Sequence, residues 1–206
     1  MPPLSTHSEP DQANETLEAL LARIRGCRHC TSVLPHEPRP FVQAAPGARL
    51  LIIGQAPGSK VHASGIGWDD ASGDRLRDWL GLDKARFYDP ELVAQMPSGF
   101  CYPGKGDGGD LPPRPECAPL WHAPLLERLP NLRLVLLVGR YAQVLYLSPA
   151  LRRSMTETVR RWQDMPDPYF PLPHPAWRSR LWMAKHPWFE AEVLPALRKR
   201  IAEALA

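Results

Sequence analysis

The sequence predicts an α/β domain with a mainly parallel central sheet. Three short apolar runs, at residues 49–54, 132–139 and 169–172, are bounded by turn residues, as expected of strands buried on both faces. Segments with helical periodicity alternate with these runs, which is the order that a parallel sheet with crossover helices requires. The length of 206 residues fits one domain with a continuous core.

The N-terminal part begins with residues 1–12, which show no periodicity and are expected to be a disordered tail. A single domain then covers residues 13–206. Asn14 can cap a first helix, and Gly26 can end it immediately before the first cysteine. The apolar residues of this helix recur at helical spacing: Leu17, Leu20, Leu21 and Ile24.

The first strand leads into the loop 54–70, and the third leads into the loop 173–182. Ligand sites in α/β domains lie where strands end and loops begin, so these two loops are expected to form a common site at one sheet edge. After the first loop, Ser72 can cap a helix over residues 72–80, and Gly81 can close it.

The second half continues the alternation of strands and helices. Residues 117–128 and 141–147 are predicted to be helical, on either side of the second strand. The last helix begins near Pro187, and Pro195 should kink it. One face of this helix carries an apolar stripe: Phe189, Val193, Leu197, Ile201 and Leu205.

The composition and hydropathy of the chain indicate its cellular location but do not identify its binding partner. The 25 basic and 22 acidic residues give a net charge of only +3, which neither demands nor excludes a polyanion. The longest apolar stretches are too short to span a bilayer, and residues 1–9 lack a signal-peptide pattern. We therefore expect a cytoplasmic monomer without a membrane partner.

All four cysteines fall into one pattern, Cys27-x2-Cys30 followed by Cys101-x15-Cys117. Four thiolates suit either zinc or a [4Fe–4S] cluster, whereas disulfides are uncommon in a cytosolic protein. The second pair is wider than zinc ribbons usually have, which disfavours a ribbon without excluding zinc.

These cysteines belong to a set of motifs that also includes Gly54-Gln-Ala-Pro-Gly58 and His174-Pro-Ala176. Over residues 20–197 the set resembles the uracil-DNA glycosylase superfamily, and specifically its family-four-type iron–sulfur members. The resemblance implies a three-layer α/β/α sandwich with a central four-stranded, mainly parallel sheet. It implies a monofunctional hydrolase that flips uracil out of DNA and leaves an abasic site. It also implies a structural [4Fe–4S] cluster, with zinc as the alternative, on four ligands: Cys27, Cys30, Cys101 and Cys117.

The resemblance assigns the chemistry of bond cleavage mainly to His174. Cleavage of the N-glycosidic bond places negative charge on the departing uracil, and a neutral imidazole at this position would donate a hydrogen bond to the uracil O2. The loop after the first strand would hold the base and its nucleotide, with glycines that allow close approach. Its members are Gly54, Gln55, Ala56, Pro57 and Gly58.

The residue that activates water departs from the family pattern. Related enzymes carry a carboxylate at the position of Gln55 or of Ala56, and this chain has neither. Gln55 could orient a water molecule through its amide oxygen. Asp70, Asp69 and His62 are the replacement candidates, and we favour Asp70 because a carboxylate can polarise water and stabilise a cationic sugar. The two acids could also simply begin a helix.

Two further roles follow from the resemblance. Trp68 stands where relatives stack an aromatic ring on the flipped base. Relatives also carry an Asn shortly before the third cysteine, which reads the pyrimidine edge, and Ser98 could substitute for it here. Candidate contacts to DNA are Trp177, Arg178, Arg180 and Lys105.

The missing carboxylates keep other functions open. The chain could be a non-catalytic iron–sulfur protein that binds or senses damaged DNA, or a glycosylase for another deaminated base such as hypoxanthine or xanthine. A zinc-ribbon module without a repair role is a further alternative.

Overall fold

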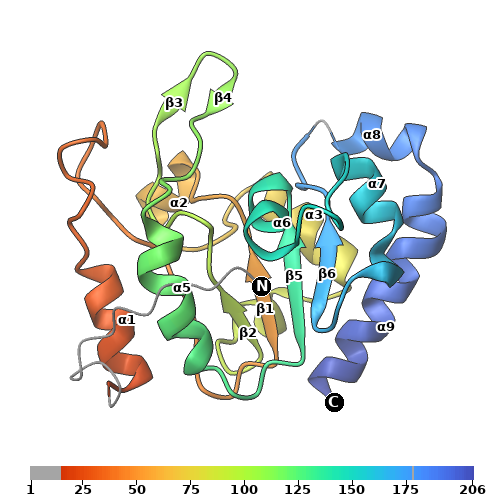
Figure 1. The fold of residues 1–206 in the computed structure, drawn as a ribbon, viewed down its shortest axis with the longest axis horizontal. Helices are drawn as coiled ribbons and strands as arrows, with labels where there is room; N and C mark the ends of the chain where they lie inside the picture. Colours follow the sequence, from red (N-terminus) through yellow and green to blue (C-terminus); the bar gives the residue numbers. More distant parts are fainter. Residues whose placement is uncertain (1–14, 178) are drawn as a thin grey trace.

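The computed structural model describes residues 15–177 and 179–206. A four-stranded sheet in the order β2-β1-β5-β6 forms its centre, and each neighbouring pair is parallel. Helices cover both faces of this sheet (Figure 1), so the predicted α/β/α sandwich is confirmed. The strands are β1 (Leu50–Ile53), β2 (Val93–Gln95), β5 (Leu134–Val138) and β6 (Tyr169–Leu172).

The two faces of β1 and β5 serve two separate cores. Leu50 and Ile52 face the core that contains α3 (Ala71–Leu80), α7 (Met155–Arg160) and α9 (Leu194–Leu205). Leu51 and Ile53 face the other core, which contains α1 (Leu17–Arg25), α5 (Cys117–Glu127) and α6 (Arg140–Tyr146). Side chains alternate between the faces of a strand, so an apolar residue is required at every position of these two strands.

The remaining elements connect or decorate this sandwich. A two-stranded antiparallel hairpin projects from the carboxyl edge of the sheet (Figure 1). Within the described residues, no helix is long and apolar enough to cross a membrane. The connecting elements are α2 (Ser59–Ser64), β3 (Lys105–Gly106), β4 (Gly109–Asp110), α4 (Lys84–Tyr88), a 3-10 turn (Trp162–Asp164), α8 (Ser179–Lys185) and a π-helical segment (Phe189–Val193).

Three local predictions need correction. Asn14 lies outside the described residues, and α1 is capped by Thr16, whose side chain accepts from the Ala19 amide. Asp70, rather than Ser72, caps α3, because its carboxylate reaches two backbone amides. The last helix, predicted as one element from about Pro187, is divided into the π-helical segment Phe189–Val193 and α9, and Pro195 stands in the first turn of α9, where a missing N–H is tolerated.

The strand β2 and the β3–β4 hairpin were not predicted from the sequence. The strand β2 has only three residues, and the hairpin strands β3 and β4 have two each, too few for an alternating pattern. The predicted tail, residues 1–12, lies outside the described residues.

Candidate functional site

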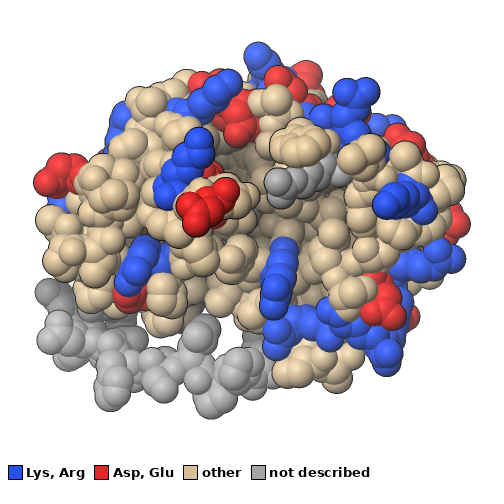
Figure 2. Space-filling view, turned by 90° about the horizontal axis from the view of Figure 1, so that it is seen from above, with Lys and Arg blue, Asp and Glu red and all other residues tan. Residues whose placement is uncertain are grey.

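A cavity of about 370 Å³ opens at the carboxyl ends of the parallel strands. Figure 2 looks down on this edge and shows a hollow near the centre of the face. The two predicted loops, 54–70 and 173–182, both contribute to its wall, together with the hairpin and the end of β2. Of the candidate site residues, those that line the cavity are Gly54, Gln55, Ala56, Pro57, Gly58, Trp68, Asp70 and His174.

Trp68 has a left-handed backbone, with φ of 56°, which is rare outside glycine. Its carbonyl oxygen accepts from the Tyr88 hydroxyl at 3.3 Å and from the Arg77 guanidinium at 3.4 Å. Its ring lies so close to Gly54 that a β-carbon there would come within 2.9 Å of it. The indole is therefore held in the cavity wall by its neighbours, with its ring centre 5.9 Å from that of His174.

His174 reaches the same cavity from the loop after β6. Arg75 on α3 fastens this loop, since its guanidinium donates to the carbonyl oxygens of Pro175 and Ala176 at 3.1 and 2.7 Å. Burial lowers the pKa of His174, while the carboxylates of Asp70 and Asp110 act in the opposite direction. A lowered pKa favours the neutral imidazole, which is a hydrogen-bond donor and acceptor.

The two adjacent acids point to different places. Asp70 lines the cavity, and its Oδ1 accepts from the Ser72 and Gly73 amides at 2.8 and 2.9 Å. Asp69 is exposed and lies outside the cavity lining; its charge acts on the Tyr88 hydroxyl, whose pKa is raised mainly by burial. The structure thus brings only Asp70 of this pair to the cavity, where it also caps a helix.

Gln95, at the end of β2, is a cavity residue that the sequence did not indicate. Its side chain is 1% exposed, and its Nε2 donates to the Phe87 carbonyl at 3.4 Å. Its Oε1 has no hydrogen-bond partner within the part of the chain that the structure describes. A β-carbon on Gly67 would come within 2.2 Å of this oxygen, so a larger residue at position 67 would collide with the Gln95 side chain.

The hairpin adds a second carboxylate, Asp110, to the cavity wall, and this residue was not identified from the sequence. Asp110 lines the cavity, and it lies close enough to Tyr102 to raise the pKa of that hydroxyl together with burial, which is the main cause. Gln55 approaches the same hairpin, because its Nε2 donates to the Leu111 carbonyl at 3.5 Å. The Gly-rich sequence is compatible with a hairpin, but only the fold brings Asp110 to the cavity.

His62 and Ser98 have other neighbours. His62 lies outside the cavity lining and contacts the rings of His36 and Tyr102, and burial is the main cause of its lowered pKa. Ser98 is buried, and its hydroxyl donates to the Gly54 carbonyl at 2.7 Å. Ser98 therefore supports the loop from beneath and does not line the cavity.

The candidate DNA contacts surround the opening. Trp177 is 68% exposed, Arg180 is exposed at the start of α8, and Lys105 is exposed on β3. Arg178 lies outside the described residues. The cavity lining does not include Trp177, Arg180 or Lys105, so these side chains belong to the surface around the cavity.

The four cysteines converge on a separate small cavity. Cys27, Cys30, Cys101 and Cys117 line it together with apolar neighbours that include Phe100, and no disulfide joins them. Burial is the main cause that raises the pKa of Cys101 to about 12 and that of Cys117 to about 11. Within the described residues, no group of three or more His, Cys, Asp or Glu side chains is arranged to hold a single metal ion.

Comparison with protein families agrees with this architecture. The family model described as the uracil DNA glycosylase superfamily matches residues 41–198, which include all of the sheet and both loops of the cavity. Members of this superfamily are glycosylases that act on DNA. The chain belongs to the uracil DNA glycosylase superfamily.

Proposed function

We propose that this protein is a monofunctional glycosylase that removes uracil from DNA and that it belongs to the family-four iron–sulfur type. The observation that carries the choice of base is the unpaired, buried amide oxygen of Gln95, a residue that lines the cavity. A buried acceptor without a partner costs free energy, on the order of 1–3 kcal/mol. A ligand with an N–H at the right place recovers this cost.

Uracil offers such a donor at N3, whereas cytosine has an acceptor at the same position. The Nε2 of Gln95 is already committed to Phe87, so the amide has a preferred orientation with its oxygen free. Cytosine would place two acceptors against each other and leave both unsatisfied. Recognition by Gln95 therefore favours uracil over the normal base by chemistry as well as by shape.

The flat faces of Trp68 and Phe41, which both line the cavity, suit a flipped base. Stacking of a base on an aromatic ring contributes roughly 1–3 kcal/mol. The support of the Trp68 carbonyl by Tyr88 and Arg77 keeps the indole in place before the base arrives. Preorganisation of this kind reduces the entropy lost on binding.

His174 and Asp70 stabilise the two opposite charges that develop as the N-glycosidic bond breaks, negative on the uracil and positive on the sugar. The neutral imidazole of His174 donates to the uracil oxygen that becomes negative. The carboxylate of Asp70 faces the sugar side, where it stabilises positive charge and polarises the attacking water. Within the described residues no lysine lines the cavity, which supports hydrolysis without a covalent amine intermediate.

The cysteine cavity supports the iron–sulfur assignment. The four cysteines line one cavity without a disulfide between them, and the wide spacing of Cys101 and Cys117 favours a cluster over a zinc ribbon, which holds its sulfur atoms about 2.3 Å from one ion. A [4Fe–4S] cluster also uses four thiolates but separates them more widely. Cys27, Cys30, Cys101 and Cys117 would hold this cluster, which would join the first helix to the segment that carries the hairpin.

Excision is tested with oligonucleotides that each contain one uracil, hypoxanthine or xanthine, followed by alkaline cleavage of abasic sites. We expect product from uracil. Product only from a purine would assign the protein to another deaminated base, because the N1–H of hypoxanthine also offers a donor to Gln95. Binding without product from any of the three would make it a DNA-binding protein.

The cluster has its own test. Protein purified without oxygen should show broad visible absorbance and contain about four iron atoms per chain. Replacement of Cys30 by Ser should remove the absorbance and lower thermal stability. A colourless wild-type protein with one zinc per chain would contradict the assignment.

A further inference from the structure

A third cavity, of about 500 Å³, lies between α6 and α7. Three arginines line it, Arg140, Arg152 and Arg153, and the remaining wall includes the neutral polar residues Gln143 and Thr158. Neither the cysteine cavity nor the base cavity shares a lining residue with it.

The arginines of this cavity lack carboxylate partners. Across residues 15–177 and 179–206, none of the three guanidinium groups belongs to an ion pair. The Nε of Arg152 is buried and has no hydrogen-bond acceptor among the described residues. A guanidinium stays charged and offers five donors, so an unpaired buried N–H next to two further arginines favours a bound anion.

One carboxylate lies nearby but is engaged elsewhere. Glu157 forms a capping box at the start of α7, where its carboxylate accepts from the Ser154 amide and hydroxyl at 3.2 and 2.9 Å. Those hydrogen bonds are the main cause of its lowered pKa, and the charge of Arg153 contributes less. Glu157 thus offsets part of the charge of Arg153, while Arg140 and Arg152 remain uncompensated.

The turn that carries Arg152 and Arg153 is held by hydrogen bonds within residues 148–158. The Arg152 amide donates to the Ser148 carbonyl at 3.1 Å, and the Arg153 amide donates to the Thr158 hydroxyl at 3.2 Å. Thr158 is buried and donates in turn to the Ser154 carbonyl at 3.0 Å. The backbone of the site is therefore formed before a ligand arrives, which favours affinity.

The cavity stands next to the base cavity on the same sheet edge. Arg140 is the first residue of α6 and follows Gly139, where a β-carbon would lie 3.3 Å from the Cβ of His174. Basic side chains gather on the side of the face where α6 and α7 lie (Figure 2). A DNA strand with one nucleotide in the base cavity would pass this side of the molecule.

We propose that this arginine cavity binds an internal backbone phosphate of the DNA strand, close to the flipped nucleotide. The inference rests on the proposed action on DNA. A phosphodiester carries one negative charge and two acceptor oxygens, which match a guanidinium pair with a free Nε–H. The contact positions the strand and carries no information about the base sequence.

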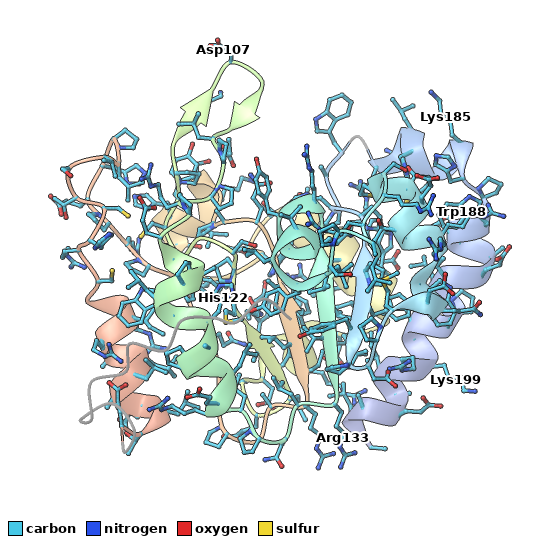
Figure 3. All side chains as sticks on the ribbon, in the orientation of Figure 1. Asp107, His122, Arg133, Lys185, Trp188 and Lys199 are labelled. Atoms are coloured by element: carbon cyan, nitrogen blue, oxygen red, sulfur yellow. The ribbon has the colours of Figure 1, made fainter. Side chains whose placement is uncertain are left out.

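The test compares Arg152→Gln and Arg140→Gln with Arg133→Gln in the full chain. Arg133 is exposed just before β5, at the opposite end of the sheet (Figure 3), so its replacement changes net charge equally without touching the cavity. Binding of a duplex with a non-cleavable uracil nucleotide is measured at several salt concentrations. Each cavity variant should reduce the slope of log K against log salt by about 1, and the control should leave it unchanged.

The position of the contact is tested by neutral methylphosphonate links placed one at a time. Wild-type affinity should fall at one internal link near the uracil, and Arg152→Gln should no longer respond to that same substitution. An equal response of both proteins at every link would overturn the proposal. Dependence on a 5′-terminal phosphate alone would also overturn it.

Folding and function are separated by two further measurements. Arg152→Lys keeps the positive charge and should therefore keep most of the slope of log K against log salt. Thermal midpoints show whether the variants are folded. At saturating DNA, Arg152→Gln should excise the base at the wild-type rate. If the wild type excises uracil normally but the folded variants keep the wild-type slope of log K against log salt, only the phosphate site is rejected. If the wild type excises no base, the proposed function is rejected, and the binding measurements still decide whether the phosphate site exists.

Discussion

His174 is the residue at which the environment most directly sets the chemistry. It has no carboxylate hydrogen-bond partner among the described residues, and burial holds its pKa below the usual value against the opposing charges of Asp70 and Asp110. The side chain is therefore neutral at pH 7 and can donate one N–H to a developing anion. Arg75 holds its loop from a different element, through hydrogen bonds to the carbonyls of Pro175 and Ala176.

Replacement of His174 by Ala should lower the single-turnover excision rate by about 10²–10³, the range for loss of one donor to a developing oxyanion. DNA affinity should change little, because the hydrogen bond strengthens only in the transition state. Quench-flow measurement at saturating enzyme gives the excision rate, and a binding titration with a non-cleavable uracil duplex gives the DNA affinity. A rate within a few fold of wild type would contradict the role of His174.

Asp70 combines a structural and a chemical role, and the two can be separated. Asn is also a good helix cap, so Asp70→Asn should keep the thermal midpoint within a few degrees while removing the charge at the cavity. We expect excision to slow by at least about 10²-fold, the lower end of the range for general-base residues. Asp69→Asn is the matched control and should excise at the wild-type rate. Equal loss in both variants would reject the assignment to Asp70.

At the scale of elements, α5 connects the cysteine cavity to the base cavity through His122. This side chain is labelled in Figure 3. It is 3% exposed, and its Nε2 lies 3.2 Å from the Pro97 carbonyl and its Nδ1 2.7 Å from the Tyr146 hydroxyl. These partners require a neutral ring that donates from Nε2 and accepts at Nδ1. Burial lowers its pKa to about 4.

The lowered pKa of His122 predicts a loss of stability in acid. Below the unfolded pKa of 6.5 the unfolded chain binds a proton that the folded chain does not. The free energy of unfolding should therefore fall between pH 6.5 and 4, by up to about 1.4 kcal/mol per pH unit from this group. Urea unfolding of wild type and His122→Asn at several pH values checks this. The wild-type curve should be steeper in that window, and parallel curves would contradict the account.

Elements also show what the sequence could and could not predict. The runs that became β1, β5 and β6 were recognisable because every residue is apolar, a consequence of having a core on both faces. The strand β2 was missed because three residues give no pattern, and with it Gln95 was missed. Helix α3 was predicted at nearly its true start, yet the cap was assigned to Ser72 because sequence alone does not show that Asp70 reaches the amides.

At the scale of the whole molecule, parallel strands deliver loops from distant parts of the chain to one edge. Residues 54–70 and 173–182 were expected to meet because both follow strands, and they do line one cavity. The hairpin arrives from a third part of the chain, and nothing in the local sequence indicates how far it reaches over the cavity. This is why Asp110 could be found only in the folded structure.

We propose that the buried amide oxygen of Gln95 selects uracil in the cavity of this glycosylase. The most direct measurement is single-turnover excision of uracil by wild type, Gln95→Leu and Gln43→Leu. Gln43 is the matched control, because its half-buried amide donates to the carbonyls of Tyr88 and Val93 outside the cavity. The account predicts rapid excision by wild type, loss of about 10–100-fold in Gln95→Leu and little loss in Gln43→Leu. Undiminished excision by a folded Gln95→Leu protein would contradict it.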